Sequence, residues 1–201
     1  MSQRALILTT VIAVVLAAGI YYLGTLRRHL APTAESTLRS EQKARTQLNE
    51  EALQQSGGQA QTITLYFPSY ATGNLLPETR SLKLSSDNIT AVRQILLALI
   101  EGSHEGHGTA LSPSTTVRAV FLSQDGTAII DLSQEALADF QPGIESENLA
   151  IYSIVDSLCA NLSQVKEVRF LVQGSEVQTL DGHIDLTGNF APEPSLIAQT
   201  Q

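Results

Sequence analysis

A β-hairpin in the middle of the chain, over residues 116–133, restricts the fold more than any other stretch. Apolar residues recur at every second position in both of its runs, which is the period of a half-buried strand. They are Val117, Ala119 and Phe121 in the first run and Ala128, Ile130 and Leu132 in the second. Between the runs, Asp125-Gly126 supplies the positive φ angles that a tight turn needs. Because a lone hairpin is marginally stable in water, the chain must add at least a third strand and a covering helix.

The charge of the chain excludes several classes of partner. The net charge is −8 over 201 residues, and residues 61–201 hold six Lys and Arg against sixteen Asp and Glu, a net of −10. Such a field repels nucleic-acid phosphates and anionic lipid headgroups, so we expect no nucleic-acid binding. The single cysteine, Cys159, allows neither an internal disulfide nor a thiolate zinc cluster. Its place beside the apolar stripe of a helix predicts a small core residue.

An uncharged apolar run over residues 5–26 predicts a transmembrane anchor at residues 1–28. About twenty such residues in a helix span the roughly 30 Å hydrocarbon core of a bilayer. Tyr21 and Tyr22 stand near the end of the run, where aromatic belts lie. A cleaved signal peptide is the alternative, but its apolar region is typically shorter, at about 7–15 residues. One basic side chain precedes the run and two follow it, a count that slightly favours a cytoplasmic C-terminal side.

Residues 29–61 form a polar segment that we interpret as a partly helical spacer. Helix formers dominate residues 36–55, but leucines occur only at Leu38, Leu48 and Leu53, too sparsely for the seam of a coiled coil. The segment ends in a flexible Ser-Gly-Gly. Such a spacer allows the folded domain to stand off from the membrane surface.

The remaining chain alternates strand and helix patterns. A period of two predicts strands and a period of 3.6 predicts helices, with Asp87 or Asn88 as the N-cap of the first helix and Gly102 as its stop. The predicted elements are a strand at 62–67 ended by Pro68, a loop at 70–79, a strand at 80–84, a helix at 89–101, the hairpin, a short helix at 134–140 capped by Ser133, a helix at 144–164, a strand at 166–173, and terminal β pieces at 176–180 and 183–186. This order predicts an α+β domain with one mixed sheet of about five strands and two helices on one face.

Several of these residues together resemble the GerMN domain family, which is named after a protein of sporulation and spore germination. The family pattern has L-x-G-P at the end of the first helix, a Pro-Gly-like turn before the third strand, a strand ending in D-L-S, and a late glycine. The corresponding positions here are residues 99–103, Pro113-Ser114, residues 131–133 and Gly174. Ser103 replaces the expected proline, and the glycine-rich residues 104–108 are an insertion relative to the pattern. The resemblance covers roughly residues 62–187.

The resemblance implies an envelope location and a role without catalysis. Family members sit outside the cytoplasmic membrane as lipoproteins or membrane-anchored proteins. This implies a single-pass anchor in the cytoplasmic membrane with the C-terminal domain outside the cytoplasm, against the count of flanking charges. Long acidic domains translocate largely regardless of such charges. Members resemble ring-building domains of envelope assemblies. The family pattern contains no catalytic residues, so no catalytic, cofactor-binding or metal-binding residue is assigned.

A cluster of histidines offers an enzymatic alternative. His104, Glu105 and His107 are residue types that ligate divalent metals, and a loop would allow them to converge. The zincin pattern needs histidines at i and i+4 on a helix, whereas these are three apart on a glycine-rich loop. A structural role is therefore the favoured interpretation.

A second cluster contains the residue types of a nucleophilic triad. These are Ser133, His183 and Asp185. The chain has no Gly-x-Ser-x-Gly elbow, and the spacing of His183 and Asp185 predicts a hydrogen-bonded pair on one strand face. We therefore favour a structural role here as well.

The sequence thus predicts four segments: an anchor at 1–28, a spacer at 29–61, a GerMN-like domain at 62–190 and a flexible tail at 191–201. The expected protein is a non-enzymatic, membrane-anchored envelope protein without a cofactor, whose domain binds envelope proteins, its own copies or peptidoglycan. The alternatives are a membrane-tethered, metal-dependent hydrolase and a sensor that binds an envelope ligand between the sheet and residues 102–113. For self-association, the expected surface is an exposed strand edge or the outer face of a helix.

Overall fold

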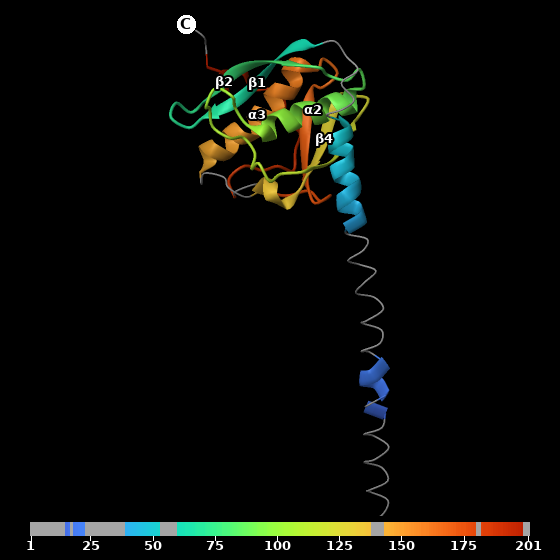
Figure 1. The fold of residues 1–201 in the computed structure, drawn as a ribbon. Helices are drawn as coiled ribbons and strands as arrows, with labels where there is room; N and C mark the ends of the chain where they lie inside the picture. Colours follow the sequence, from blue (N-terminus) through green and yellow to red (C-terminus); the bar gives the residue numbers. More distant parts are fainter. Residues whose placement is uncertain are drawn as a thin grey trace, which may run out of the picture. The chain divides into compact units, whose positions relative to one another are not determined.

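The computed structural model describes residues 15–16, 18–22, 39–52, 60–137, 143–179 and 182–198 (Figure 1). The chain divides into two compact units, Met1–Thr46 and Gln47–Gln201. Most of the predicted membrane-spanning run, residues 5–26, lies outside the described residues, so the anchor stays a prediction. Among the described residues, no helix has both the length and the apolar character needed to cross a membrane.

The second unit contains the predicted α+β domain (Figure 1). It starts with the last residues of a helix over 39–52, part of the predicted spacer, and Ala52 is buried in it. The elements that follow are β1 (Gln61–Ser69), β2 (Asn74–Leu82), α2 (Asn88–Glu101), β3 (Val117–Leu122), β4 (Thr127–Leu132), η1 (Gln134–Leu137), α3 (Ile144–Asn161), β5 (Glu167–Val172) and η2 (Pro194–Leu196). Residues 138–140 of the predicted short helix lie outside the described residues.

The strands form two sheets, so the prediction of one five-stranded sheet is wrong. Strands β1 and β2 are an antiparallel pair, and a second sheet has the order β3-β4-β5. In this second sheet the predicted hairpin β3-β4 is antiparallel, while β4 and β5 are parallel and are connected through α3. The sheets do not merge because the outer edge of β1 bonds to side chains of α3 and not to another strand.

Strand β2 begins at Asn74, which corrects the predicted loop at 70–79 and the predicted strand at 80–84. The prolines that suggested a loop lie inside the paired region, with Pro68 opposite Leu75 and Pro77 opposite Tyr66. Tyr66 donates its N–H to α3 and not to β2, so this pair is not joined by ladder hydrogen bonds. Proline is tolerated at such a position because its missing N–H would face away from the partner strand.

Helix α2 has the predicted limits. The Asp87 side chain accepts the N–H of Thr90 at 2.8 Å, as an N-cap does. Gly102 ends the helix with φ +93° and donates its N–H to the carbonyl of Leu99. A positive φ at this position favours glycine, so the stop signal and the cap are confirmed.

An irregular pairing in β3 changes which residues face the core. The register between β3 and β4 shifts between Val117 and Ala119, which is the signature of a β-bulge. Beyond the shift the alternation is reversed, so that Val120 is buried whereas Phe121 is 57% exposed. The prediction that Val117, Ala119 and Phe121 share one face is therefore wrong.

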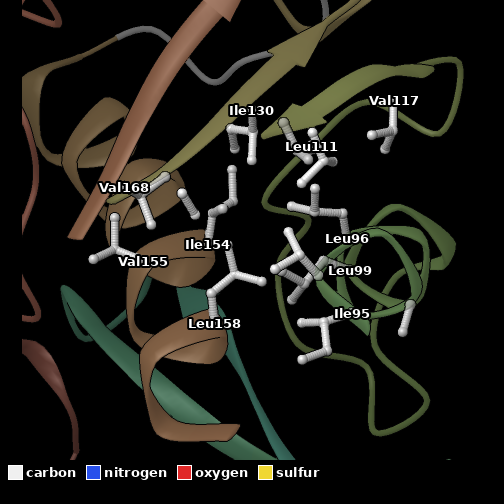
Figure 2. Close-up of a cluster of buried hydrophobic side chains, with 14 of the residues drawn as sticks. Ile95, Leu96, Leu99, Leu111, Val117, Ile130, Ile154, Val155, Leu158 and Val168 are labelled. Atoms are coloured by element: carbon white, nitrogen blue, oxygen red, sulfur yellow. The ribbon is translucent and has the colours of Figure 1, made fainter. Parts of the chain in front are cut away.

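The core lies between the two helices and the inner face of the second sheet. Figure 2 shows side chains of α2 and α3 pointing toward one another, with those of β4 and β5 beside them. The labelled residues of this cluster are Ile95, Leu96, Leu99, Leu111, Val117, Ile130, Ile154, Val155, Leu158 and Val168. Cys159 packs against this core, as predicted, and burial raises the pKa of its thiol to about 11.

A polar stripe on α3 satisfies the outer edge of β1. Asn161 accepts the N–H of Thr64 at 3.0 Å and donates to the carbonyl of the same residue at 2.6 Å. One turn earlier Ser157 accepts the N–H of Tyr66 at 2.9 Å, and Ser153 donates to the Tyr66 carbonyl. Residues spaced four apart share one helix face, so α3 acts toward β1 as a neighbouring strand would.

The C-terminal residues form a strap across the domain. Phe190 exchanges both backbone hydrogen bonds with Val168 of β5, and the N–H of Ala198 bonds to the carbonyl of Leu75 in β2. Residues 191–198, which the sequence analysis assigned to a flexible tail, thus include residues with hydrogen bonds to the domain. Residues 199–201 lie outside the described residues. The described parts of the predicted terminal β pieces, 176–179 and 183–186, contain no strand.

Replacing Asn161 by alanine tests the closure of the β1 edge. We expect Asn161→Ala to lower the free energy of unfolding by about 1–3 kcal/mol, because the N–H and the carbonyl of Thr64 would lose their partner in a part-buried place. Chemical denaturation monitored by circular dichroism measures this change. Asn148→Ala makes the same substitution near the start of α3 and is expected to cost less than about 0.5 kcal/mol. Equal effects would contradict the assignment.

Candidate interaction surface

A buried ion pair in β2 holds the loop that follows α2. Glu78 is 2% exposed, and its carboxylate accepts Arg80 Nε–H at 2.6 Å. It also accepts the Ser103 hydroxyl at 2.5 Å and the N–H groups of His104 and Glu105 at 3.1–3.3 Å. The serine that departs from the family pattern thus takes part in fixing the loop.

The partners of Glu78 keep its carboxylate charged. Burial alone would raise the pKa of Glu78, but hydrogen bonds from Ser103, Arg80 and the backbone of His104 outweigh it and lower the pKa to about 2. Arg80 in turn donates to the carbonyls of Ala98 and Gly102, and its guanidinium lies 5.3 Å from the centre of the Phe67 ring. The pair therefore ties the end of α2 to β2.

The histidines of this loop pair separately. His104 Nε2 lies 3.3 Å from Glu101, and His107 Nε2 lies 3.3 Å from Glu105. Among the described residues, no three His, Cys, Asp or Glu side chains are placed so that they could hold a metal ion. His104 and His107 are thus paired with two different carboxylates.

The residues of the predicted triad are also engaged elsewhere. Asp185 accepts the N–H and the hydroxyl of Thr187, and Ser133 accepts the N–H of Thr116. The carboxylate near His183 is Glu147, which is fully buried and accepts the backbone N–H of His183 at 2.9 Å. The imidazole Nδ1 lies 3.6 Å from the same carboxylate. The sequence analysis missed Glu147, whose distance from His183 along the chain gave no signal.

Two positions of the family pattern meet in space. The N–H of Gly174 donates to Asp131 at 2.8 Å, so the late glycine bonds to the aspartate of the D-L-S strand end. The other oxygen of Asp131 accepts Arg118 Nε–H at 3.0 Å. Asp131 is 6% exposed, and its carboxylate accepts hydrogen bonds from the Gly174 backbone and the Arg118 side chain. This is a structural role.

Most of the sheet edges are covered by the chain itself. Polar side chains of α3 cover β1, and the backbone of Phe190 covers β5 at Val168. On the outer edge of β2, the carbonyl of Leu75 accepts the N–H of Ala198. Two residues further along the same edge stands Pro77, which has no N–H group. Proline on an edge is a common protection against pairing with another chain.

The outer edge of β3 has no such cover. Across the described residues, no hydrogen bond from another segment reaches the backbone of this edge between Arg118 and Leu122. At the start of the strand, the carbonyl of Val117 accepts a hydrogen bond from Arg93, which also donates to Asn49. Phe121 stands exposed on this strand, directly across from Ile129 of β4 on the sheet face turned away from the core. The open edge and this aromatic side chain together form what we call the β3 surface, residues 118–122.

A groove of about 560 Å³ lies beside α2. It runs between the end of β2, the helix and the loop that precedes β3. Its lining is mostly apolar and comprises Leu82, Lys83, Leu84, Gln94, Leu97, Ala98, Ile100, Glu101 and Pro113. Of residues 102–113, the loop beside which a ligand site was predicted, the lining of this groove includes only Pro113.

A buried carboxyl group anchors the C-terminal strap. Asp156 is 3% exposed and accepts the N–H of Glu193 at 3.0 Å, while its Oδ2 atom has no hydrogen-bond partner among the described residues. Burial, and secondarily the charge of Glu193, raises the pKa of Asp156 to about 6. This carboxyl group is thus partly protonated just below neutral pH.

The comparisons with known proteins agree with this geometry. The family model described as "Germane: Sporulation and spore germination" matches residues 64–178. The match covers more than half of the chain, so the chain belongs to this family of α+β domains. A search of curated proteins finds no match.

Solved GerMN domains show the same fold at low sequence identity. The tandem GerMN domains of the sporulation protein GerM from Bacillus subtilis match with a TM-score of 0.53 and 21% identity over 68% of this chain, which spans 48% of that chain. The first GerMN domain of the same protein matches with a TM-score of 0.50 and 23% identity over 66% of this chain and 97% of that chain. A Clostridium perfringens protein described as a lipoprotein gives a TM-score of 0.49 and 23% identity over 70% of this chain and 95% of that chain.

Replacing Glu78 by glutamine tests the loop anchor. The pKa of Glu78 is lower in the folded chain than its ordinary value of 4.5, so its stabilising effect is present above about pH 4.5 and is lost as the pH falls toward about 2. We expect Glu78→Gln to lower the free energy of unfolding at neutral pH by about 2–4 kcal/mol. Glu101→Gln, an exposed carboxylate 3.6 Å from Arg80, should cost less than about 1 kcal/mol. Equal losses in both variants would show that burial of Glu78 does not matter.

The raised pKa of Asp156 predicts the opposite pH dependence of the unfolding free energy. Its pKa is higher in the folded chain than its ordinary value of 3.8, so folding loses stability as the pH rises from about 4 to about 6. The unfolding free energy of Asp156→Asn minus that of the parent should therefore rise by about 1–3 kcal/mol as the pH rises from about 4 to about 8. Asp185→Asn is the control, because hydrogen bonds from Thr187 lower the pKa of this exposed carboxylate. A flat difference between Asp156→Asn and the parent across this range would refute the assignment.

Proposed function

We propose that the chain is a non-enzymatic, membrane-anchored envelope protein whose domain assembles with another protein through the β3 surface. The observation that carries this proposal is the uncovered edge of β3 with the exposed Phe121 beside it. Soluble domains usually protect an apolar strand edge, so an unprotected one marks a place where a partner strand pairs. Binding of this kind needs no catalytic group.

The placement of the buried carboxylates supports a role without catalysis. Glu78, Asp131, Glu147 and Asp156 each accept at least one backbone N–H of a loop or of the strap. These hydrogen bonds hold irregular segments of the chain in place. Shaped loops on a rigid scaffold are suited to recognition of another macromolecule.

The family and the sequence support an envelope location. The family is described as sporulation and spore germination, and the similar B. subtilis chains come from a sporulation protein. In our proposal, residues 5–26 anchor this chain in the cytoplasmic membrane, and the domain stands outside the cytoplasm on its polar spacer. The spacer gives the β3 surface the reach to meet other envelope proteins or peptidoglycan.

Crosslinking in the native membrane tests the proposal. The full-length chain is crosslinked with an amine- and carboxyl-reactive reagent, purified, and its linked peptides are identified by mass spectrometry. We expect links to a second copy of the chain or to a defined set of envelope proteins. These links should fall at least several-fold in a Phe121→Lys variant, because a charge on the edge disfavours strand pairing. Ile144→Lys changes a similarly exposed apolar residue on α3 and should leave the links unchanged. Links that persist in Phe121→Lys would rule out the β3 surface, and links only to glycan would favour cell-wall binding.

A sensory role is the second candidate, and the groove along α2 is the observation that favours it. Its volume of about 560 Å³ lies in the range of small-molecule sites. An envelope ligand bound there would raise the melting temperature of the parent but not of a Leu97→Arg variant, whose side chain enters the groove. A thermal-shift screen of envelope extracts separates this role from assembly, since assembly depends on Phe121 and not on Leu97.

A further inference from the structure

We propose that the β3 surface joins two copies of this chain, with strand β3 of one copy pairing antiparallel to β3 of the second about a twofold axis at Phe121. This inference rests on the proposed function, because it names the partner that the same surface takes. The three-stranded sheets of the two copies would then join into one six-stranded sheet with the order β5-β4-β3-β3-β4-β5. Such a contact is isologous and closes on itself as a dimer.

The hydrogen-bond pattern of the hairpin decides which backbone groups are available. The N–H of Ser123 donates to the carbonyl of Thr127 at 3.0 Å, toward β4. Alternate residues of an antiparallel strand point their backbone groups to opposite sides, so Phe121 bonds toward Ile129. The N–H and carbonyl groups of Val120 and Leu122 therefore point outward. An axis at Phe121 places Val120 of each copy opposite Leu122 of the other, in the orientation that exchanges both bonds.

The side chains fit the same register. Phe121 lies opposite its own copy in a pair without ladder hydrogen bonds, which is where facing side chains approach most closely. An aromatic pair at such a position is among the more favourable cross-strand contacts. The bulge between Val117 and Ala119 lies outside the three central residues, so it does not interrupt the seam.

Local charge does not oppose the pairing of two copies along β3. Between residues 118 and 122 the only ionisable side chain is Arg118, which is already paired with Asp131 at 3.0 Å. The central residues Val120, Phe121 and Leu122 carry no lysine or proline, the residues that normally prevent such edges from pairing. The strand is therefore compatible with itself, whereas the edge of β2 carries Pro77.

The overall charge sets the strength of the contact and its salt dependence. A net of −10 over residues 61–201 makes two copies repel each other, and a seam of one short strand buries less surface than a stable dimer needs. We therefore expect a weak dimer that strengthens with salt, since ions screen the repulsion. Attachment of both copies to one membrane raises their effective concentration and compensates for low affinity.

Disulfide trapping in the full-length chain tests the register. In a Cys159→Ser background, Phe121→Cys should give a covalent dimer on mild oxidation of membranes isolated from the cells that express it, because facing residues of this type lie about 4.5 Å apart at Cα, within disulfide range. Ile144→Cys, 62% exposed against 57% for Phe121, is the matched control. We expect at least a fivefold higher yield for Phe121→Cys, rising further from about 0.05 M to about 0.5 M salt. Two tagged copies carrying Ala119→Cys and Ser123→Cys should also link to each other.

The outcomes separate this inference from the proposed function. Equal dimer yields for Phe121→Cys and Ile144→Cys would overturn the pairing of two copies. If crosslinks to other envelope proteins were then still lost in Phe121→Lys, the β3 surface would serve a different partner and the proposed function would stand. If Phe121→Lys changed no crosslink at all, the proposed function would fall together with the inference. A Phe121→Cys dimer whose yield fell with salt would also contradict pairing of two acidic copies.

Discussion

The structure depends on how the backbone groups at strand edges are satisfied. A buried N–H or carbonyl without a partner costs on the order of 1–3 kcal/mol, so a short strand next to a helix must find a partner on that helix. Ser153, Ser157 and Asn161 supply this partner for β1, and they do so on the same helix whose apolar face forms the core. This arrangement fixes the position of the β1-β2 hairpin on α3 without joining it to the second sheet.

The buried carboxylates extend the same principle to the loops. Glu78 fixes the turn after α2, Asp131 the turn after β5, Glu147 the segment near His183, and Asp156 the C-terminal strap. Each accepts N–H groups that no regular element satisfies. The pattern that relates this chain to its family includes two of these contacting residues, Asp131 and Gly174, so part of that pattern encodes loop anchoring.

The local signals in the sequence predicted individual elements well and their assembly less well. The cap at Asp87, the stop at Gly102 and the turn at Gly126 depend on neighbouring residues, and the structure contains all three. The bulge in β3 and the prolines inside the β1-β2 pair were missed because each depends on a partner strand. The division into two sheets was missed because it depends on a helix distant in sequence, although three polar residues spaced by four within an apolar helix were a visible sign. The single exposed aromatic on an edge could be found only once the bulge was known.

Hydrogen exchange of backbone amides tests the central claim most directly, namely that the chain covers the edges of β1 and β5 and leaves that of β3 open. In the dilute full-length chain, we predict slow exchange for the amides of Thr64, Tyr66 and Val168, whose N–H groups bond to α3 or to the strap. The amides of Val120 and Leu122 should exchange rapidly at low concentration and slow down as the concentration rises. Slow exchange of Val120 and Leu122 at the lowest concentration, or rapid exchange of Thr64 and Tyr66, would contradict the account.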